Sequence, residues 1–217
     1  MTSEARFALA GLYAITPVMA DTQRLVERVL HALEGGASLV QYRAKELSAA
    51  IALEQARRLA KLCQAHRVPL IVNDSVELAL AAGADGVHVG REDAAPAAAR
   101  AALPRGILGV SCYCTPESAR AAAAAGADYV AIGSVFASAT KPGAARARLG
   151  QIAEARLAGG LPVAAIGGIN AANVAQVAAA GADMAAVISA LFEADDVRFA
   201  ARGLSGPFSA SARRTHG

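Results

Sequence analysis

The tetrapeptide Ala82-Gly83-Ala84-Asp85 returns as Ala125-Gly126-Ala127-Asp128 and as the last four residues of Ala179–Asp183. A looser copy is Gly35-Gly36-Ala37-Ser38. Each copy follows a stretch that predicts a helix and precedes a short apolar run. Glycine at such a boundary can adopt the left-handed conformation that ends a helix, and the apolar runs are typical of strands buried on both faces. The repeat therefore predicts helices alternating with parallel strands.

Apolar runs of strand length occur eight times along the chain. They are Leu12 to Thr16, Leu39 to Arg43, Leu70 to Asp74, Gly86 to Val89, Ile107 to Cys112, Tyr129 to Ser134, Val163 to Gly167 and Met184 to Ser189. The segments between them are long enough for helices, and Thr22 to Leu33 and Ser48 to His66 carry apolar residues at helical spacing. We therefore predict an α/β fold, a single-domain (β/α)8 TIM barrel over residues 1–204. The alternative is an open, doubly wound sheet.

The length and composition of the chain are consistent with a single domain. The chain has 217 residues, 55% of them hydrophobic, and contains no linker-like stretch. The net charge is +3 and the basic residues are spread along the chain, so we expect no nucleic-acid partner. No long apolar segment predicts a leader or a membrane span, and we expect a cytoplasmic protein with no membrane partner and with its three cysteines reduced. Residues 205–217 are polar and are expected to form a flexible tail.

Cationic side chains follow the second predicted strand, in Gln41-Tyr42-Arg43-Ala44-Lys45. If the extended conformation continues, its period of two puts Gln41, Arg43 and Lys45 on one face, with Tyr42 and Ala44 on the other. Two cations held together suit a phosphate or diphosphate group. The alternative is a strand exit that simply lies in solvent.

Two carboxylates follow the next two strands. Asp74 comes directly after Asn73, and Asp93 follows Gly90 after the fourth strand. Because reactive groups of such barrels lie where strands lead into helices, these carboxylates are expected beside the cations, where they suit a Mg²⁺ ion that also contacts phosphate oxygens. The alternative is that each Asp merely caps the following helix.

Glycines and hydroxyl groups mark the later strand ends. Gly167-Gly168 follows strand seven and Ile188-Ser189 ends strand eight, where such barrels commonly bind phosphate; an ordinary tight turn is the alternative. The polar connection 136–143 suits a loop over a charged ligand, or a plain surface loop. Ser111, at the end of strand five, is a possible hydrogen-bond donor, and His88 is expected to be a hydrogen-bonded core histidine.

Taken in order, these stretches resemble the thiamine-phosphate synthase family. The resemblance covers roughly Gly11 to Phe192 and is carried by Gln41-Tyr42-Arg43-Ala44-Lys45, Asn73-Asp74, Gly90-Arg91-Glu92-Asp93, Gly109-Val110-Ser111, Gly133-Ser134-Val135-Phe136 through Thr140-Lys141, and Gly167-Gly168-Ile169. It implies a transferase that joins hydroxymethylpyrimidine diphosphate to a thiazole phosphate and releases diphosphate. The implied mechanism is dissociative and needs no side-chain nucleophile.

The resemblance also implies roles for individual residues. The implied pyrimidine diphosphate site consists of Gln41, Tyr42, Arg43, Ala44, Lys45, Asn73, Ser111 and Lys141. Within it, Arg43, Lys45 and Lys141 would be the catalytic cations that stabilise the leaving diphosphate. The implied thiazole phosphate site consists of Ser138, Ala139, Thr140, Gly168, Ile188 and Ser189. Asp74 and Asp93 would bind Mg²⁺, and the family resemblance suggests a small homo-oligomer.

Three positions depart from the commoner family pattern: Arg91, Ala137 and Ser138, which keeps the hydroxyl of the more frequent threonine. Other functions also remain open. A thiazole tautomerase of the same superfamily would not need the full set of cations and carboxylates, and a non-catalytic barrel would bind phosphate without turnover. A sugar-phosphate isomerase or aldolase would use a general base or a Schiff-base lysine.

Overall fold

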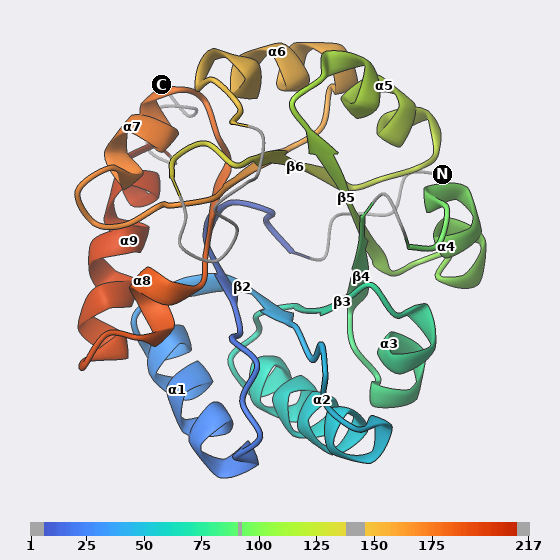
Figure 1. Cartoon of the computed structure of the whole chain (residues 1–217), viewed down its shortest axis with the longest axis vertical. Coiled ribbons are helices and arrows are strands. Elements are labelled where there is room, and N and C mark those ends of the chain that lie inside the picture. The colour runs from blue at the N-terminus through green and yellow to red at the C-terminus, as the bar shows by residue number, and fades with distance from the viewer. Residues whose placement is uncertain (1–6, 91–92, 138–145, 212–217) are drawn as a thin grey trace.

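Eight parallel strands form a closed barrel in the computed structural model of the chain, which describes residues 7–90, 93–137 and 146–211. Each strand pairs with its neighbours in sequence order, and β1 pairs with β8 to close the ring (Figure 1). The strands are β1 Gly11–Ile15, β2 Ala37–Tyr42, β3 Leu70–Asn73, β4 Gly86–Val89, β5 Ile107–Tyr113, β6 Tyr129–Gly133, β7 Val163–Ile166 and β8 Met184–Val187. The predicted barrel is confirmed, and the alternative open sheet is wrong.

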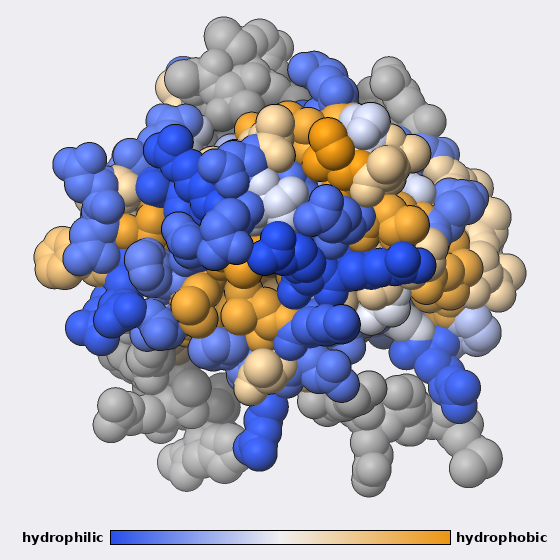
Figure 2. Space-filling view, turned by 90° about the horizontal axis from the view of Figure 1, so that it is seen from below, coloured by the Kyte–Doolittle hydropathy of each residue, from blue (hydrophilic) through white to orange (hydrophobic). Residues whose placement is uncertain are grey.

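Helices surround the barrel on its outside (Figure 1). They are α1 Thr22–Glu34, α2 Ala49–Ala65, α3 Val76–Ala82, α4 Pro96–Ala102, α5 Pro116–Ala124, α6 Gly150–Gly159, α7 Val174–Ala179, α8 Ser189–Phe192 and α9 Val197–Ser211. On the side of the molecule that α1 and α2 form, polar side chains cover most of the surface, with apolar residues in smaller groups between them (Figure 2). No helix in the described ranges combines the length and the apolar character that a bilayer span requires.

The core has two layers, one on each side of the strands. Side chains such as Leu39, Ile71 and Met184 fill the inside of the barrel, whereas Val40 and Val72 pack outward against the helices. This alternation follows from the period of two in a strand, and it explains why the runs are apolar throughout. The interior is therefore packed, and a ligand is expected at the ends of the strands.

The aspartates of the repeat hold the amino ends of alternate strands. The Oδ2 atoms of Asp85, Asp128 and Asp183 accept hydrogen bonds from the backbone N–H groups of Leu70, Leu108 and Val163, at 3.0, 2.7 and 2.9 Å. These N–H groups lie at the starts of β3, β5 and β7. The repeat glycines have φ between +69° and +90°, which is the predicted left-handed turn. Each repeat thus ends a helix and holds the preceding strand.

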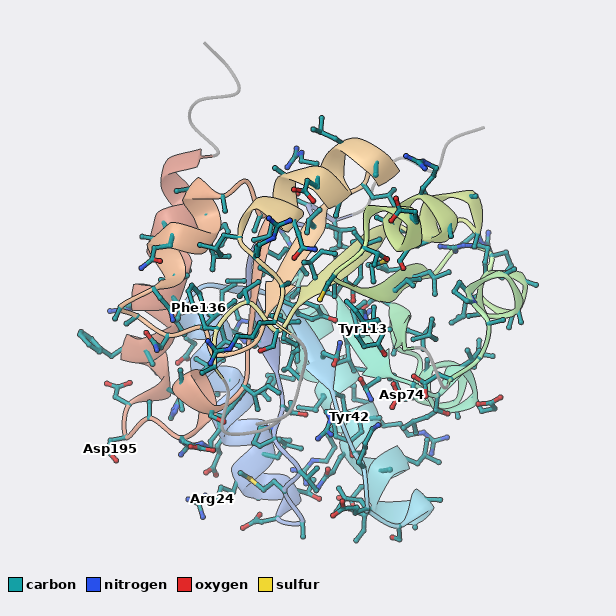
Figure 3. All side chains as sticks on the ribbon, turned by 45° about the horizontal axis from the view of Figure 1, so that its top comes forward. Arg24, Tyr42, Asp74, Tyr113, Phe136 and Asp195 are labelled. Carbon is teal, nitrogen blue, oxygen red and sulfur yellow. The ribbon has the colours of Figure 1, made fainter. Side chains whose placement is uncertain are left out.

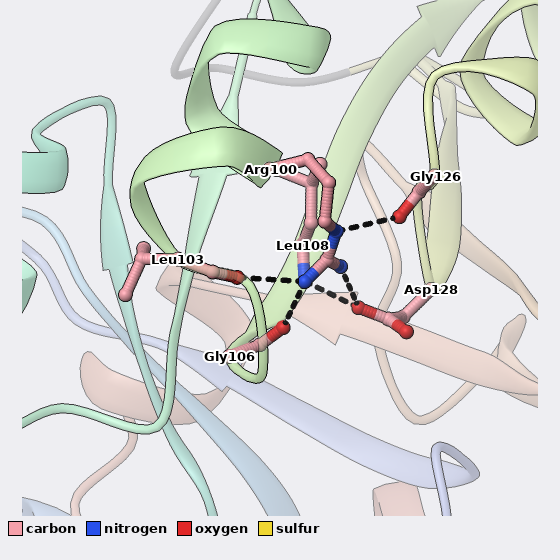
Figure 4. A network of polar contacts seen from close by, with 6 residues as sticks. All are labelled: Arg100, Leu103, Gly106, Leu108, Gly126 and Asp128. Carbon is pink, nitrogen blue, oxygen red and sulfur yellow. Dashed lines mark hydrogen bonds and ion pairs between the residues drawn. The ribbon is translucent and has the colours of Figure 1, made fainter. Parts of the chain in front are cut away.

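One of these aspartates belongs to a larger polar network (Figure 4). Arg100 of α4 donates to Asp128 Oδ2 at 2.5 Å and to the backbone carbonyl oxygens of Leu103, Gly106 and Gly126 at 2.8 to 3.0 Å. The guanidinium therefore links the end of α4, the start of β5 and the turn before β6.

The C-terminal tail differs from the prediction. The helix α9 continues to Ser211, so a flexible tail from residue 205 is wrong as far as Ser211, and residues 212–217 lie outside the described part. The reason is that Val197, Ala201, Leu204 and Phe208 recur at helical spacing and are buried. Arg198 of α9 also forms an ion pair with Glu34 of α1.

Candidate active site

A cavity of about 590 Å³ opens at the carboxyl ends of the strands. Its walls come from residues at the ends of all eight strands and from the turns that follow them. It brings together most of the residues expected to bind substrate or metal: Gln41, Arg43, Lys45, Asn73, Asp74, Asp93, Ser111, Gly168, Ile188 and Ser189. Ser138, Ala139, Thr140 and Lys141 lie outside the described residues, as do Arg91 and Glu92.

The end of β2 supplies alternate residues to this cavity, as the period of two predicts. Gln41, Arg43 and Lys45 line it. The side chain of Tyr42 lies on the other face of the strand, where its hydroxyl donates to Gln55 Oε1 of α2 at 2.8 Å (Figure 3). Ala44 is likewise not among the lining residues. Neither the Tyr42 hydroxyl nor the Ala44 methyl therefore faces a ligand in the cavity.

The two carboxylates lie beside each other and beside a cation. Lys45 Nζ is 3.1 Å from Asp74 Oδ2. Burial raises the pKa of Asp74, and the neighbouring Asp93 raises it further, while Lys45 acts in the opposite direction. Two neighbouring carboxylates repel each other when both are ionised, and a cation bound between them would stabilise the pair.

Neither carboxylate caps a helix. Ser75 is the N-cap of α3, and Ala95 occupies that position before α4. Asp74 instead has φ +67°, with its N–H donating to the His88 carbonyl oxygen at 2.8 Å. Asp93 Oδ2 accepts from the Gly90 N–H at 2.7 Å. The helix-cap alternative is therefore wrong for both residues.

A chain of hydrogen bonds crosses the barrel, and all of its members except Tyr129 line the cavity. Gln41 Nε2 donates to the Tyr13 hydroxyl at 2.7 Å, and this hydroxyl lies 2.6 Å from that of Tyr129. The Tyr129 hydroxyl lies 3.0 Å from His88 Nδ1, and His88 Nε2 lies 2.9 Å from Ser111 Oγ. His88 is the predicted hydrogen-bonded core histidine, and burial lowers its pKa to about 4. Its ring is therefore neutral at pH 7.

Tyr13, Tyr129 and Tyr113 were not singled out from the sequence. Tyr13 lines the cavity and contacts Tyr129 edge to face, with ring centroids 5.8 Å apart. Tyr113 also lines the cavity and is 41% exposed. Its backbone has φ +54° beside an irregularity in the β5–β6 register. The only sequence signal for Tyr13 is a polar atom in an otherwise apolar strand.

Glycines at the end of β7 allow close approach of the neighbouring β6 loop. A Cβ atom on Gly167 would overlap Ser134, and one on Gly168 would overlap the carbonyl oxygen of Ala137. Both glycines also have positive φ, +105° and +63°. The close packing against the β6 loop therefore requires glycine at both positions, and both residues also line the cavity.

These features define a class of protein: a (β/α)8-barrel enzyme with cations, paired carboxylates and two glycines lining one cavity at its open end. The sequence model described as thiamine monophosphate synthase matches residues 12–191. The chain belongs to this family, so the resemblance stated above is confirmed.

Individual relatives agree with the family match. The chain is 56% identical over 189 residues to the thiamine-phosphate synthase of Aromatoleum aromaticum, covering 87% of this chain and 91% of that protein. It is 53% identical over 201 residues to the enzyme of the same name from Thiobacillus denitrificans, covering 92% and 95%. The solved thiamine phosphate pyrophosphorylase of Pyrococcus furiosus superposes with a TM-score of 0.84 at 38% identity, covering 94% and 98%. These similarities favour the synthase over the tautomerase, phosphate-binding and isomerase alternatives.

Proposed function

We propose that the chain condenses hydroxymethylpyrimidine diphosphate with a thiazole phosphate to give thiamine phosphate and diphosphate. Family membership and identity above 50% to thiamine-phosphate synthases support the reaction. The observation that carries it in the structure is the meeting of Arg43, Lys45, Asp74 and Asp93 at one wall of the cavity. A polyanionic leaving group needs this combination of cations and metal-ligating carboxylates.

The proposed reaction needs no side-chain nucleophile. The bond between the pyrimidine methylene carbon and the diphosphate oxygen breaks, and its electron pair leaves with diphosphate. The thiazole nitrogen then donates its lone pair to the same carbon. Arg43 and Lys45 line the cavity just beyond the end of β2 and would stabilise the charge that develops on the leaving oxygen. Lys141, outside the described residues, is proposed for the same role.

The donor set at this wall fits Mg²⁺. Among the described residues no cluster contains three or more histidine, cysteine or acidic side chains, so an all-protein metal cage is absent there. Mg²⁺ is commonly held by one or two carboxylates together with substrate phosphates and water. Asp74 and Asp93 supply those carboxylates, and the metal would neutralise phosphate charge in the bound state.

The two substrates are assigned to opposite walls. The pyrimidine diphosphate would be held by Gln41, Asn73 and Ser111 from β2, β3 and β5, and by Arg43 and Lys45 just beyond β2. Gly168, Ile188 and Ser189, beyond β7 and β8, would hold the thiazole phosphate, together with residues 138–140. Among the described residues that line the cavity, His88 is the only histidine, and both of its ring nitrogens are in hydrogen bonds. This arrangement is consistent with a mechanism that uses no general base at this position.

The experiment is diphosphate release from the purified protein with both substrates, over a Mg²⁺ titration and with a chelator. Release is expected only with both substrates and the metal. Asp93→Asn should raise the Mg²⁺ concentration for half-maximal rate by about tenfold or more, because one carboxylate ligand is lost. Asp195→Asn is the matched control, since Asp195 is exposed at the periphery beyond α8 (Figure 3).

The outcomes separate the two assignments. If Asp93→Asn has the metal dependence of the wild type, the carboxylate site is wrong while the reaction stands. If the folded wild-type protein releases no diphosphate with both substrates and Mg²⁺, the reaction itself is wrong.

A further inference from the structure

The hydrogen-bond chain along the cavity joins two residues that the proposed function places against the pyrimidine diphosphate. Its ends, Gln41 and Ser111, line the cavity from β2 and β5, and Tyr13 and His88 between them also line it. Its middle members come from β1, β6 and β4: Tyr13 is 1% exposed, Tyr129 0% and His88 7%. Four consecutive contacts of 2.6 to 3.0 Å connect them. A polar chain through a barrel core is costly unless every member is hydrogen-bonded, so its proton order matters.

The order of the protons follows from counting donors. Each tyrosine hydroxyl carries one proton, and the neutral imidazole carries one N–H. Gln41 Nε2 donates to the Tyr13 oxygen, so the Tyr13 proton has Tyr129 as its partner. An unused hydroxyl proton at this depth would cost about 1–3 kcal/mol. Tyr129 then donates to His88 Nδ1, and the remaining proton on His88 Nε2 points to Ser111 Oγ.

This direction fixes what both ends present to a ligand. Ser111 Oγ accepts from His88, so its own hydroxyl proton remains for a lone pair in the cavity. At the other end, Gln41 donates one of its two amide N–H groups within the chain, and its Oε1 atom is left as an acceptor. Reversing every bond would exchange the two properties, because a chain of neutral groups has only two consistent directions.

We propose that Tyr129 and His88 are positioning residues that set Ser111 as a hydrogen-bond donor and Gln41 as an acceptor. The inference rests on the proposed function, and it deepens that function by naming how the pyrimidine side of the cavity selects its ligand. The ligand it fits carries an N–H donor toward Gln41 and a lone pair toward Ser111. An aminopyrimidine diphosphate has both, whereas the thiazole phosphate binds at the other wall.

The first test removes one oxygen from the middle of the chain. Tyr129→Phe keeps the ring that packs edge to face against Tyr13. The kcat/KM for the pyrimidine diphosphate is expected to fall by about tenfold, corresponding to one hydrogen bond, while the KM for the thiazole phosphate changes by less than about twofold. Gln55→Met is the matched control, because Gln55 is 0% exposed and hydrogen-bonded to Met19 and Tyr42 outside the barrel. It should lower stability without the selective loss.

The second test asks whether Tyr129 acts through Ser111. In a double-mutant cycle of Tyr129→Phe with Ser111→Ala, the kcat/KM of the double variant should be less than about twofold below that of Ser111→Ala alone. The reason is that the hydroxyl that the chain orients is already absent. A purely structural role for Tyr129 predicts that the two losses multiply, and that result would overturn the inference. His88 gives an independent check: His88→Gln keeps an amide N–H directed at Ser111 and should retain several-fold more kcat/KM than His88→Leu.

The outcomes also separate this inference from the proposed function. If Ser111→Ala leaves kcat/KM unchanged, the assignment of Ser111 to the pyrimidine diphosphate site is wrong and the inference falls with it. If Ser111→Ala reduces kcat/KM but Tyr129→Phe and His88→Leu do not, the site assignment stands and the inference alone is wrong.

Discussion

Replacing Asp128 with alanine should destabilise the barrel without changing its chemistry. The carboxylate accepts the N–H of Leu108, at 2.7 Å, at the start of β5. Leu108 is 1% exposed, so its N–H loses its partner at a buried residue, and an unsatisfied group of this kind costs about 1–3 kcal/mol. The ion pair with Arg100 adds at most about 1 kcal/mol, because the Asp128 side chain is 44% exposed. Arg100 keeps its three carbonyl partners.

The expected total is about 2–3 kcal/mol of unfolding free energy, or about 4–12 °C in Tm for a domain of this size. Urea unfolding and a thermal scan measure it. Asp128→Asn is the matched control, since its amide oxygen can still accept from Leu108, and it should lose about 1 kcal/mol. The kcat/KM at 25 °C should stay within about twofold of the wild-type value, because Asp128 is at the amino end of the barrel. A loss below about 0.5 kcal/mol for Asp128→Ala, or equal losses for both variants, would refute this account.

Three other predictions concern the site and the thiols. Arg43→Ala should raise the KM for the pyrimidine diphosphate by about tenfold or more while the KM for the thiazole phosphate changes little, because a cation facing a diphosphate is lost; equal increases would contradict the two-wall assignment. Gly168→Ala should raise the KM for the thiazole phosphate more than the KM for the pyrimidine diphosphate, because the Gly168 backbone is left-handed and a Cβ would overlap Ala137. An unchanged KM for the thiazole phosphate would show that this turn does not approach the ligand. Burial raises the pKa of the Cys63 and Cys112 thiols to about 12, so both stay protonated at pH 8 and should resist iodoacetamide in the native state, whereas Cys114 should be alkylated first. Mass spectrometry of labelled peptides decides this, and early labelling of Cys63 would contradict it.

The barrel could be predicted from sequence because the signal is local and repeated. Each Ala-Gly-Ala-Asp copy contains a left-handed glycine and is followed by a strand, so helix ends and strand starts are marked together. The cavity residues at strand ends could also be predicted, because in a barrel these ends converge at one opening. Gln41, Arg43 and Lys45 alternate with Tyr42 and Ala44 as the strand period requires.

Other parts of the structure had no comparable signal. Tyr13 and Tyr129 lie in strands buried on both faces, where polarity does not indicate which side chains point into the barrel. The position of Tyr113 depends on a register irregularity and a positive φ that no composition predicts. In α9, Gly203, Gly206 and Pro207 suggest a break, but the burial of Leu204 and Phe208 against the rest of the core outweighs these local preferences.

The repeat that marks the fold also bears on the site, because the same strands serve both. The repeat aspartates hold the starts of β3, β5 and β7, and the carboxyl ends of these strands lead to Asp74, Ser111 and Gly168. Asp74 is held beside Asp93 with its pKa raised by burial. Gly168 has a positive-φ backbone conformation that residues other than glycine rarely adopt. Such features cost stability, and they persist only where the surrounding structure holds them. Hydrogen bonds placed at the opposite ends of these strands can therefore stabilise the barrel without occupying the polar groups that line the cavity.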